Sequence, residues 1–217
     1  MIHARSSFHG PRWLGLAVFA AAISGAAATL TGCSSTPDTL VLGLNYTPTS
    51  APDPARLQGV AGIPATMRVW INPIVDRHPE GSQIGLSKEE DDTPVYFGAQ
   101  GLPPADFVRA ALVQVLPAYA VPVSPDSVNH THVLQLTMSR FWTLEGNTYE
   151  ATITALAVLA DRNGNTLWQA EISGANKRWG RSFQPEAYLQ VFSDAALDLG
   201  ARLALDPGFR AAMAAGG

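Results

Sequence analysis

The chain has 217 residues, of which 47% are hydrophobic and 15% charged, and its net charge is −4 at neutral pH. A single cysteine excludes an intramolecular disulfide. Because no basic excess is present to neutralise phosphates, the composition argues against nucleic acid as a partner.

The N-terminal segment has the pattern of a bacterial lipoprotein signal. Arg5 and Arg12 precede an apolar run over residues 14–30 that holds no charged side chain, as in a secretory signal. The run ends in a lipobox that consists of Leu30, Thr31, Gly32 and Cys33. An apolar run of about 20 residues also suffices to cross a bilayer, so an uncleaved membrane helix is the alternative.

We therefore predict a signal peptide over residues 1–32, a lipidated tether over residues 33–38 and one domain over residues 39–217. The resemblance to lipoprotein signals implies a diacylglyceryl thioether on Cys33, cleavage before it, and acylation of the new amino terminus. Two or more acyl chains anchor a protein stably. In a Gram-negative cell, the absence of an aspartate directly after Cys33 implies the outer membrane, with the domain facing the periplasm. Without its two leader arginines the mature chain has a net charge of −6.

The first half of the domain shows one clear strand pattern. Residues 39–46 form a short apolar run and predict an edge strand, whereas residues 47–54 are rich in Pro and Thr and predict a loop. Apolar and polar side chains alternate over residues 66–75, which predicts a strand. Residues 77–101 are polar and acidic, and we expect a long loop with one short strand at residues 94–97.

A helix is predicted to begin at Pro103 and Pro104, with Asp106 near the positive end of its dipole. One apolar face at helical spacing comprises Phe107, Val108, Ala111, Leu112, Val115 and Leu116. Pro117 and Pro122 are expected to end this helix.

Three further strands are predicted in series, over residues 132–142, 148–160 and 166–173, because apolar and polar residues alternate in each. Glu145-Gly146-Asn147 and Asn163-Gly164 are turn sequences, and Asn-Gly between strands is a strong hairpin signal. These strands are therefore expected to form an antiparallel meander.

A last helix is predicted from Gln184-Pro185-Glu186, with apolar residues every three or four positions up to Leu203. Asp206-Pro207-Gly208 is expected to end it, with one more turn over residues 209–213. The predicted fold class is α+β, a mostly antiparallel sheet of four to five strands with two helices packed on one face.

Several short motifs together resemble the YajG family of small outer-membrane lipoproteins. They are the lipobox, Val75-Asp76-Arg77 followed by Ile84-Gly85, the helix from Asp106, the strand from Val133, the turn at Asn163-Gly164-Asn165, and the end from Ser193 to Phe209. The resemblance implies a compact α/β fold in the cell envelope and, through a neighbouring muropeptide permease gene in some members, a link to the cell wall. It implies no catalytic residues.

Two clusters are compatible with metal binding. His130 and His132 have the spacing of two ligands on one strand face, but without a third ligand nearby we expect solvent-facing histidines. Residues 89–92 are consecutive acids without the alternation of a calcium loop, and we expect a solvated loop. No metal and no cofactor are predicted.

Two charged groups are compatible with binding. Asp76 and Arg77 are expected to form a local ion pair that closes a strand. A second group, which consists of Lys177, Arg178, Trp179 and Arg181, has the composition of a site for an anionic glycan or lipid phosphate. We expect instead a solvated connection between strand and helix, with Trp179 packed on the sheet.

Aromatic and acidic side chains on the predicted strands also have either a functional or a structural interpretation. Phe141, Trp142, Tyr149 and Trp168 form either a binding surface or, as we expect, core and dimer packing. Glu145, Glu150 and Glu171 are compatible with glycan hydrolysis, but we expect surface charge, with Glu150 and Glu171 paired across the hairpin.

The predicted function is a non-enzymatic, lipid-anchored periplasmic domain that binds or scaffolds an envelope protein or glycan. The alternative is an auxiliary lipoprotein of a transport or lipid-trafficking complex. A glycan-directed enzyme is the third hypothesis, and it is disfavoured because the sequence has no phosphate loop, zinc-protease motif or serine elbow.

Overall fold

The computed structural model describes residues 39–88, 92–181 and 183–215. All of them belong to one compact unit, Thr36–Gly217. The predicted signal peptide and tether, including the whole lipobox and Cys33, lie outside the described residues.

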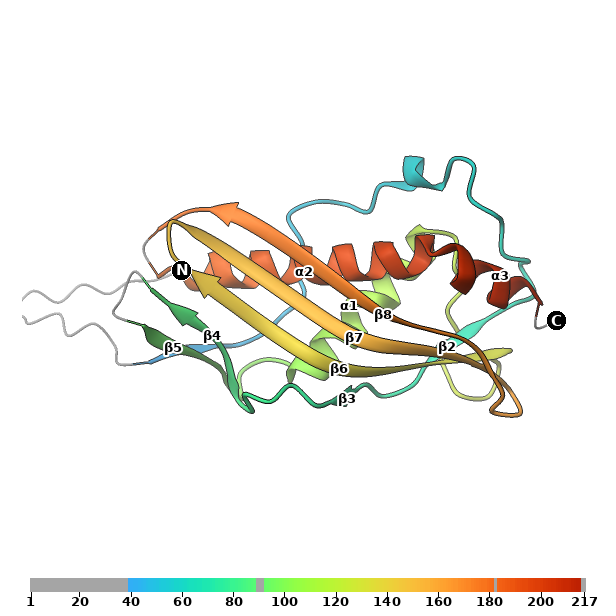
Figure 1. Ribbon diagram of the computed structural model, residues 1–217, viewed down its shortest axis with the longest axis horizontal. Coiled ribbons are helices and arrows are strands. Elements are labelled where there is room, and N and C mark those ends of the chain that lie inside the picture. The colour runs from blue at the N-terminus through green and yellow to red at the C-terminus, as the bar shows by residue number, and fades with distance from the viewer. Residues whose placement is uncertain (1–38, 89–91, 182, 216–217) are drawn as a thin grey trace, which may run out of the picture. The chain divides into compact units, whose positions relative to one another are not determined.

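The described residues form eight strands, three α-helices and one short 3-10 helix (Figure 1). The strands are β1 (Leu40–Leu42), β2 (Val69–Ile71), β3 (Val75–Asp76), β4 (Gln83–Ser87), β5 (Thr93–Phe97), β6 (His132–Glu145), β7 (Thr148–Asp161) and β8 (Thr166–Trp179). The helices are η1 (Pro54–Leu57), α1 (Pro104–Ala118), α2 (Pro185–Leu205) and α3 (Pro207–Ala215).

Three antiparallel strands, β6, β7 and β8, form the predicted meander, and each has 14 residues. Gly164 has a φ of 85° in the β7–β8 turn, a conformation that glycine adopts without strain. The alternation of buried and exposed residues in β6 shifts between Met138 and Arg140, where a register shift marks a bulge. The meander prediction is therefore confirmed, although β6 and β8 extend beyond their predicted ends.

The rest of the sheet differs from the prediction. The short strands β2, β3 and β4 run parallel to β6 along one edge, and β5 and β1 continue the sheet beyond β4. The sheet is therefore mixed, with eight strands rather than four to five. β4 lies within the predicted long loop, and it pairs closely with β6 because Gly85 has no side chain. A Cβ on Gly85 would lie 2.3 Å from Cγ2 of Thr143.

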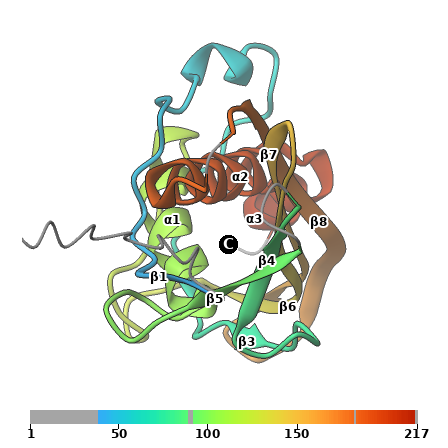
Figure 2. The same cartoon turned by 90° about the vertical axis from the view of Figure 1, so that its left-hand side faces the viewer.

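α1 and α2 cover one face of the sheet, as predicted, and a third helix, α3, also packs on β8 (Figure 2). The ring of Phe141 on β6 lies 5.8 Å from that of Phe107 on α1 and stacks at 4.3 Å on Phe192 of α2. All three rings are fully buried. Burial of each such side chain contributes about 1.5–3 kcal/mol, so this face forms the hydrophobic core.

The C-terminal end forms a third helix, which the sequence predicted only as a single turn. The side chain of Asp206 accepts the Phe209 N–H at 2.7 Å and so caps the new helix after the break. From α3, the buried Arg210 guanidinium donates to the carbonyl oxygens of Ala61, Tyr119 and Ala204 at 2.8, 2.6 and 2.8 Å. Arg210 thus joins three distant parts of the chain.

Among the described helices, none has the length and apolar character needed to cross a bilayer.

Candidate functional site

The group Lys177, Arg178, Trp179 and Arg181 lies at the end of β8 and just after it. Lys177 forms an ion pair with Glu150 at 2.5 Å, which together with the Thr148 hydroxyl lowers the pKa of Glu150. Arg181 donates to the side-chain oxygen of Asn147 at 2.5 Å. Trp179 is 78% exposed, so the expectation that it packs on the sheet is wrong.

The two histidines do not share a solvent-facing surface. His132 is fully buried and its Nδ1 lies 2.8 Å from the Thr131 hydroxyl. Burial lowers the pKa of His132, and the Asp161 carboxylate partly offsets this effect. His130 lies against the ring of Trp70 at 5.9 Å. Within the described ranges, no group of three His, Cys, Asp or Glu side chains has a geometry that holds a metal.

The carboxylates singled out in the sequence have unlike surroundings. Glu145 is fully buried, where it accepts the Tyr188 hydroxyl at 2.5 Å and the Phe183 N–H at 2.8 Å, so the expectation of surface charge is wrong for it. Burial and the Glu145 carboxylate raise the pKa of Tyr188. Glu150 lies opposite Lys177 rather than the expected Glu171.

Of two charged groups near strand ends, one differs from expectation and the other lies mostly outside the described residues. Asp76 contacts His78 at 2.5 Å instead of forming an ion pair with Arg77. Of the acidic run, residues 89–91 lie outside the described residues.

The strand aromatics are mainly core residues, as expected. Tyr149 contacts Tyr188 at 5.0 Å and Trp168 contacts Phe209 at 5.4 Å, in addition to the Phe141 stack. Trp142 is half-buried and alternates with Phe141, so it lies on the face opposite the helices.

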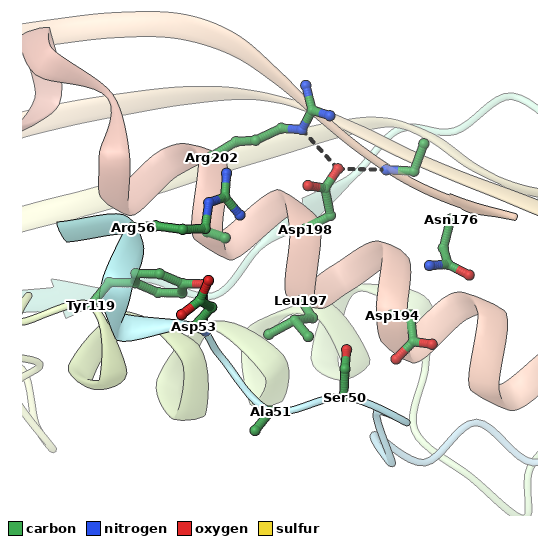
Figure 3. A pocket seen from close by; sticks show the side chains of 12 residues that line it. Ser50, Ala51, Asp53, Arg56, Tyr119, Asn176, Asp194, Leu197, Asp198 and Arg202 are labelled. Carbon is green, nitrogen blue, oxygen red and sulfur yellow. Dashed lines mark hydrogen bonds and ion pairs between the residues drawn. The ribbon is translucent and has the colours of Figure 1, made fainter. Parts of the chain in front are cut away.

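A polar pocket of about 490 Å³ is lined by the segment 50–56, α2, β8 and Tyr119 (Figure 3). Its polar lining includes Asp53, Arg56, Asn176, Asp194, Asp198 and Arg202. Figure 3 shows Asp53, Arg56 and Tyr119 toward one end of the pocket and Asn176 and Asp194 toward the other.

Side chains of α2 hold the segment that forms one wall. Ser193 accepts the Thr47 N–H at 3.0 Å, and Asp194 accepts both the N–H and the hydroxyl of Thr49, at 2.7 and 2.5 Å. Pro48, Pro52 and Pro54 have no backbone N–H, which disfavours strand pairing of this segment, and these acceptors satisfy its remaining backbone donors instead. The predicted loop over residues 47–54 is thereby fixed on α2.

The other two carboxylates also hold local structure. Asp53 accepts the Ala55 N–H at 3.0 Å at the start of η1, and its own N–H donates to the Tyr119 hydroxyl at 3.1 Å. Asp198 accepts from the Ala175 N–H at 3.2 Å and from Nε of Arg202 at 2.7 Å. Each acid of the pocket therefore has a structural partner.

The remaining polar side chains of the pocket include N–H donors without a partner among the described residues. The side chains of Arg56 and Asn176 have no hydrogen bond or ion pair with another residue that the structure describes, and the side chain of Arg202 contacts Asp198 through Nε alone. Two guanidinium groups and an amide thus offer N–H donors to a ligand. Burial, together with the charge of Asp194 and the nearby Tyr119, raises the pKa of Tyr46 to about 12.

Sequence reasoning did not identify this pocket. The available signal was in α2, where Asp194, Asp198 and Arg202 recur at intervals of four residues beside a helix face that is otherwise apolar. Buried Asp194, at 9% exposure, is unusual on such a face and marks the place where the loop docks.

No protein-family model and no curated protein matches the chain. Solved structures with a remote similarity include a protein of the family DUF330 from Xanthomonas campestris (13% identity, 77% of this chain and 92% of that chain, TM-score 0.47). Others are a PelC dodecamer from Paraburkholderia phytofirmans (17% identity, 70% and 93%, TM-score 0.39) and a minor lipoprotein from Acinetobacter baumannii (18% identity, 65% and 94%, TM-score 0.36). At these values the similarity carries no function over to this chain.

Proposed function

We propose that this chain is a bacterial envelope lipoprotein, anchored through Cys33, whose domain binds a polar ligand without converting it. The lipobox from Leu30 to Cys33 supports the anchor. Ser34, which stands where an aspartate would retain a lipoprotein in the inner membrane, supports an outer-membrane position facing the periplasm. The motifs described above support a place among YajG-like lipoproteins.

The observation that carries the binding function is the set of free donors in the pocket. Arg56, Arg202 and Asn176 line one cavity and have N–H groups without a partner among the described residues. Guanidinium groups bind carboxylates in a bidentate manner. The ligand that fits is therefore anionic or rich in acceptor groups, such as a cell-wall fragment that bears carboxylates and sugar hydroxyls.

The occupied carboxylates support a binding role over hydrolysis. A glycan hydrolase needs one carboxyl group to act as an acid and a second to act as a base or nucleophile. In the pocket, Asp53, Asp194 and Asp198 each accept hydrogen bonds that hold the fold. None of the three is left over to act on a substrate.

Calorimetric titration of the full-length protein in detergent with soluble cell-wall fragments tests this proposal. Arg56→Ala and Arg202→Ala should each weaken binding about tenfold or more, since a hydrogen bond to a charged group contributes about 1.5–3 kcal/mol. Arg140→Ala, at an exposed arginine on β6, is the matched control and should bind as wild type. Equal binding by all three variants would exclude the pocket, and turnover of the fragments would exclude a non-enzymatic role.

A second candidate, a subunit of a transport or lipid-trafficking complex, is favoured by the sheet face opposite the helices. Leu156 and Leu167 on this face are 43% and 38% exposed, and Trp142 is half-buried there. Exposed apolar side chains along a sheet face that no described helix covers are compatible with a contact with another protein. A photo-crosslinking residue at position 156 should capture an envelope protein in intact cells, whereas one at exposed Arg77 should not.

A further inference from the structure

The start of the described chain and the exposed Trp179 lie at the same end of the sheet. β1 runs parallel to β5 and begins opposite Val95, two residues after the start of β5, and β4 ends where β5 begins. β4 and β6 are parallel and end together, Ser87 opposite Glu145. β7 begins and β8 ends beside them, with Thr148 opposite Trp179. In Figure 1 these strand ends all lie toward the left.

The proposed lipid anchor is close to this end in the chain. Thr39, the first described residue, follows Cys33 by six positions. An extended chain spans at most about 3.3–3.6 Å per residue, so six residues reach about 20 Å. The other end of β8 lies about 45 Å further along the sheet, because a strand rises about 3.3 Å per residue. Only the end with Trp179 is therefore held near the bilayer.

The side chains at this end have the chemistry of a membrane interface. The indole of Trp179 is 78% exposed, which is unusual for the largest apolar side chain, and Trp is enriched where membrane and water meet. Arg178 and Arg181 flank it, and both are exposed. Exposed cations near a bilayer are attracted to lipid phosphates.

Acidic residues at the same end limit the contribution of charge. Glu150 is paired with Lys177, and Asp92 is exposed next to β5. This balance makes the indole, rather than net charge, the main contact with the headgroups.

We propose that this end of the sheet rests on the membrane that carries the anchor, with Trp179 in the headgroup region and Arg178 and Arg181 beside lipid phosphates. The proposal depends on the lipid anchor of the proposed function. It also positions the pocket. Arg202 lies about 25 Å along α2 from Pro185, at a rise of about 1.5 Å per residue, so the Arg202 end of the pocket faces the periplasm away from the bilayer.

Quenching by brominated lipids tests the proposal on the full-length lipidated protein in vesicles. Vesicles of brominated phosphatidylcholine, with and without phosphatidylglycerol, should quench the tryptophan emission of the wild-type protein. The Trp179→Phe variant should lose most of that quenching. Trp70→Phe, a matched change at the opposite end of the sheet, where β2 pairs with the start of β6, should keep it. Arg178→Ala combined with Arg181→Ala should reduce quenching only in vesicles that contain phosphatidylglycerol.

The outcomes separate the proposal from the anchor. If the protein is acylated and floats with the vesicles but Trp179→Phe is quenched like wild type, the membrane contact of Trp179 is excluded while the anchor stands. A shift of Trp179 emission with soluble cell-wall fragments, but not with lipid, would also exclude it and point to a glycan site. If the protein carries no lipid, both proposals fail.

Discussion

Asp194 on α2 holds Thr49 through both of its carboxylate oxygens, one on the backbone N–H at 2.7 Å and one on the hydroxyl at 2.5 Å. The two residues are 145 positions apart, so this contact fixes a long N-terminal segment across the helix and forms one wall of the pocket. Its strength therefore links the stability of the domain to the shape of its candidate site.

Replacing this carboxylate tests that link. Asp194→Asn keeps one acceptor but loses the charge and the second short bond, and should lower the free energy of unfolding by about 1.5–3 kcal/mol. Urea denaturation measures the change. Glu171→Gln, at an exposed carboxylate on β8, is the control and should stay within about 0.5 kcal/mol of wild type. A variant as stable as this control would mean that the segment is held by other contacts.

Arg210 should be among the most sensitive positions in the domain. Arg210→Met fills similar space but leaves the carbonyl groups of Ala61, Tyr119 and Ala204 without their donor. Because each unsatisfied buried group costs about 1–3 kcal/mol, we expect a loss of about 3 kcal/mol or more in the free energy of unfolding. Arg210→Lys should recover only part of the lost stability, because an ammonium group lacks the fixed fork of donors with which the guanidinium reaches three carbonyls. Equal stability of Arg210→Met and wild type would contradict this account.

Stability should fall in mild acid because of His132. Burial favours the neutral ring and sets the folded-state pKa below the unfolded value of about 6.5. The stabilising effect of the neutral form is therefore complete above about pH 6.5 and is lost as the pH falls through the lower folded-state pKa. Urea denaturation between pH 5 and 7.5 should show a shallower pH dependence for His132→Gln than for wild type. If the free energy of unfolding depended on pH equally in both proteins, groups other than His132 would cause the acid sensitivity. His130→Gln is the control and should keep the pH dependence of wild type.

The crossing of α2 over β8 requires a glycine at position 174. A Cβ on Gly174 would lie 2.2 Å from the Ala195 carbonyl oxygen and 2.4 Å from the Leu199 nitrogen, both backbone atoms. Gly174→Ala should therefore destabilise the domain by about 1–3 kcal/mol or more, as overpacking does. Gly146→Ala adds the same methyl group where nothing lies within 4 Å and should be close to neutral. Thermal melts of the two variants compare them directly, and equal melting temperatures would show that α2 can move away from the strand.

Local patterns were enough to predict the helices and the meander. The face of α1 and the Asn163-Gly164 turn depend on residues close in sequence, and both were found where expected. β4 was missed because its position depends on β6, about 60 residues later, and because Gly85 contributes close approach rather than an apolar pattern. Parallel pairing of short strands leaves little trace in a single sequence.

The site residues were harder to predict for the same physical reason. Glu145 adjoins a turn and has the sequence context of an exposed acid, yet Tyr188 from α2 covers it. The pocket likewise forms only when the segment 50–56 docks on α2. Trp179 was recognised by its charged neighbours, but its exposure followed only from the end of β8.

The most direct test of the account is the intact mass of the native protein from membranes, compared with that of Cys33→Ala. We predict a chain that begins at Cys33 with three acyl chains, and no acylated species in the variant. A mass that retains Met1 would contradict the lipid anchor and would make residues 14–30 the membrane attachment instead.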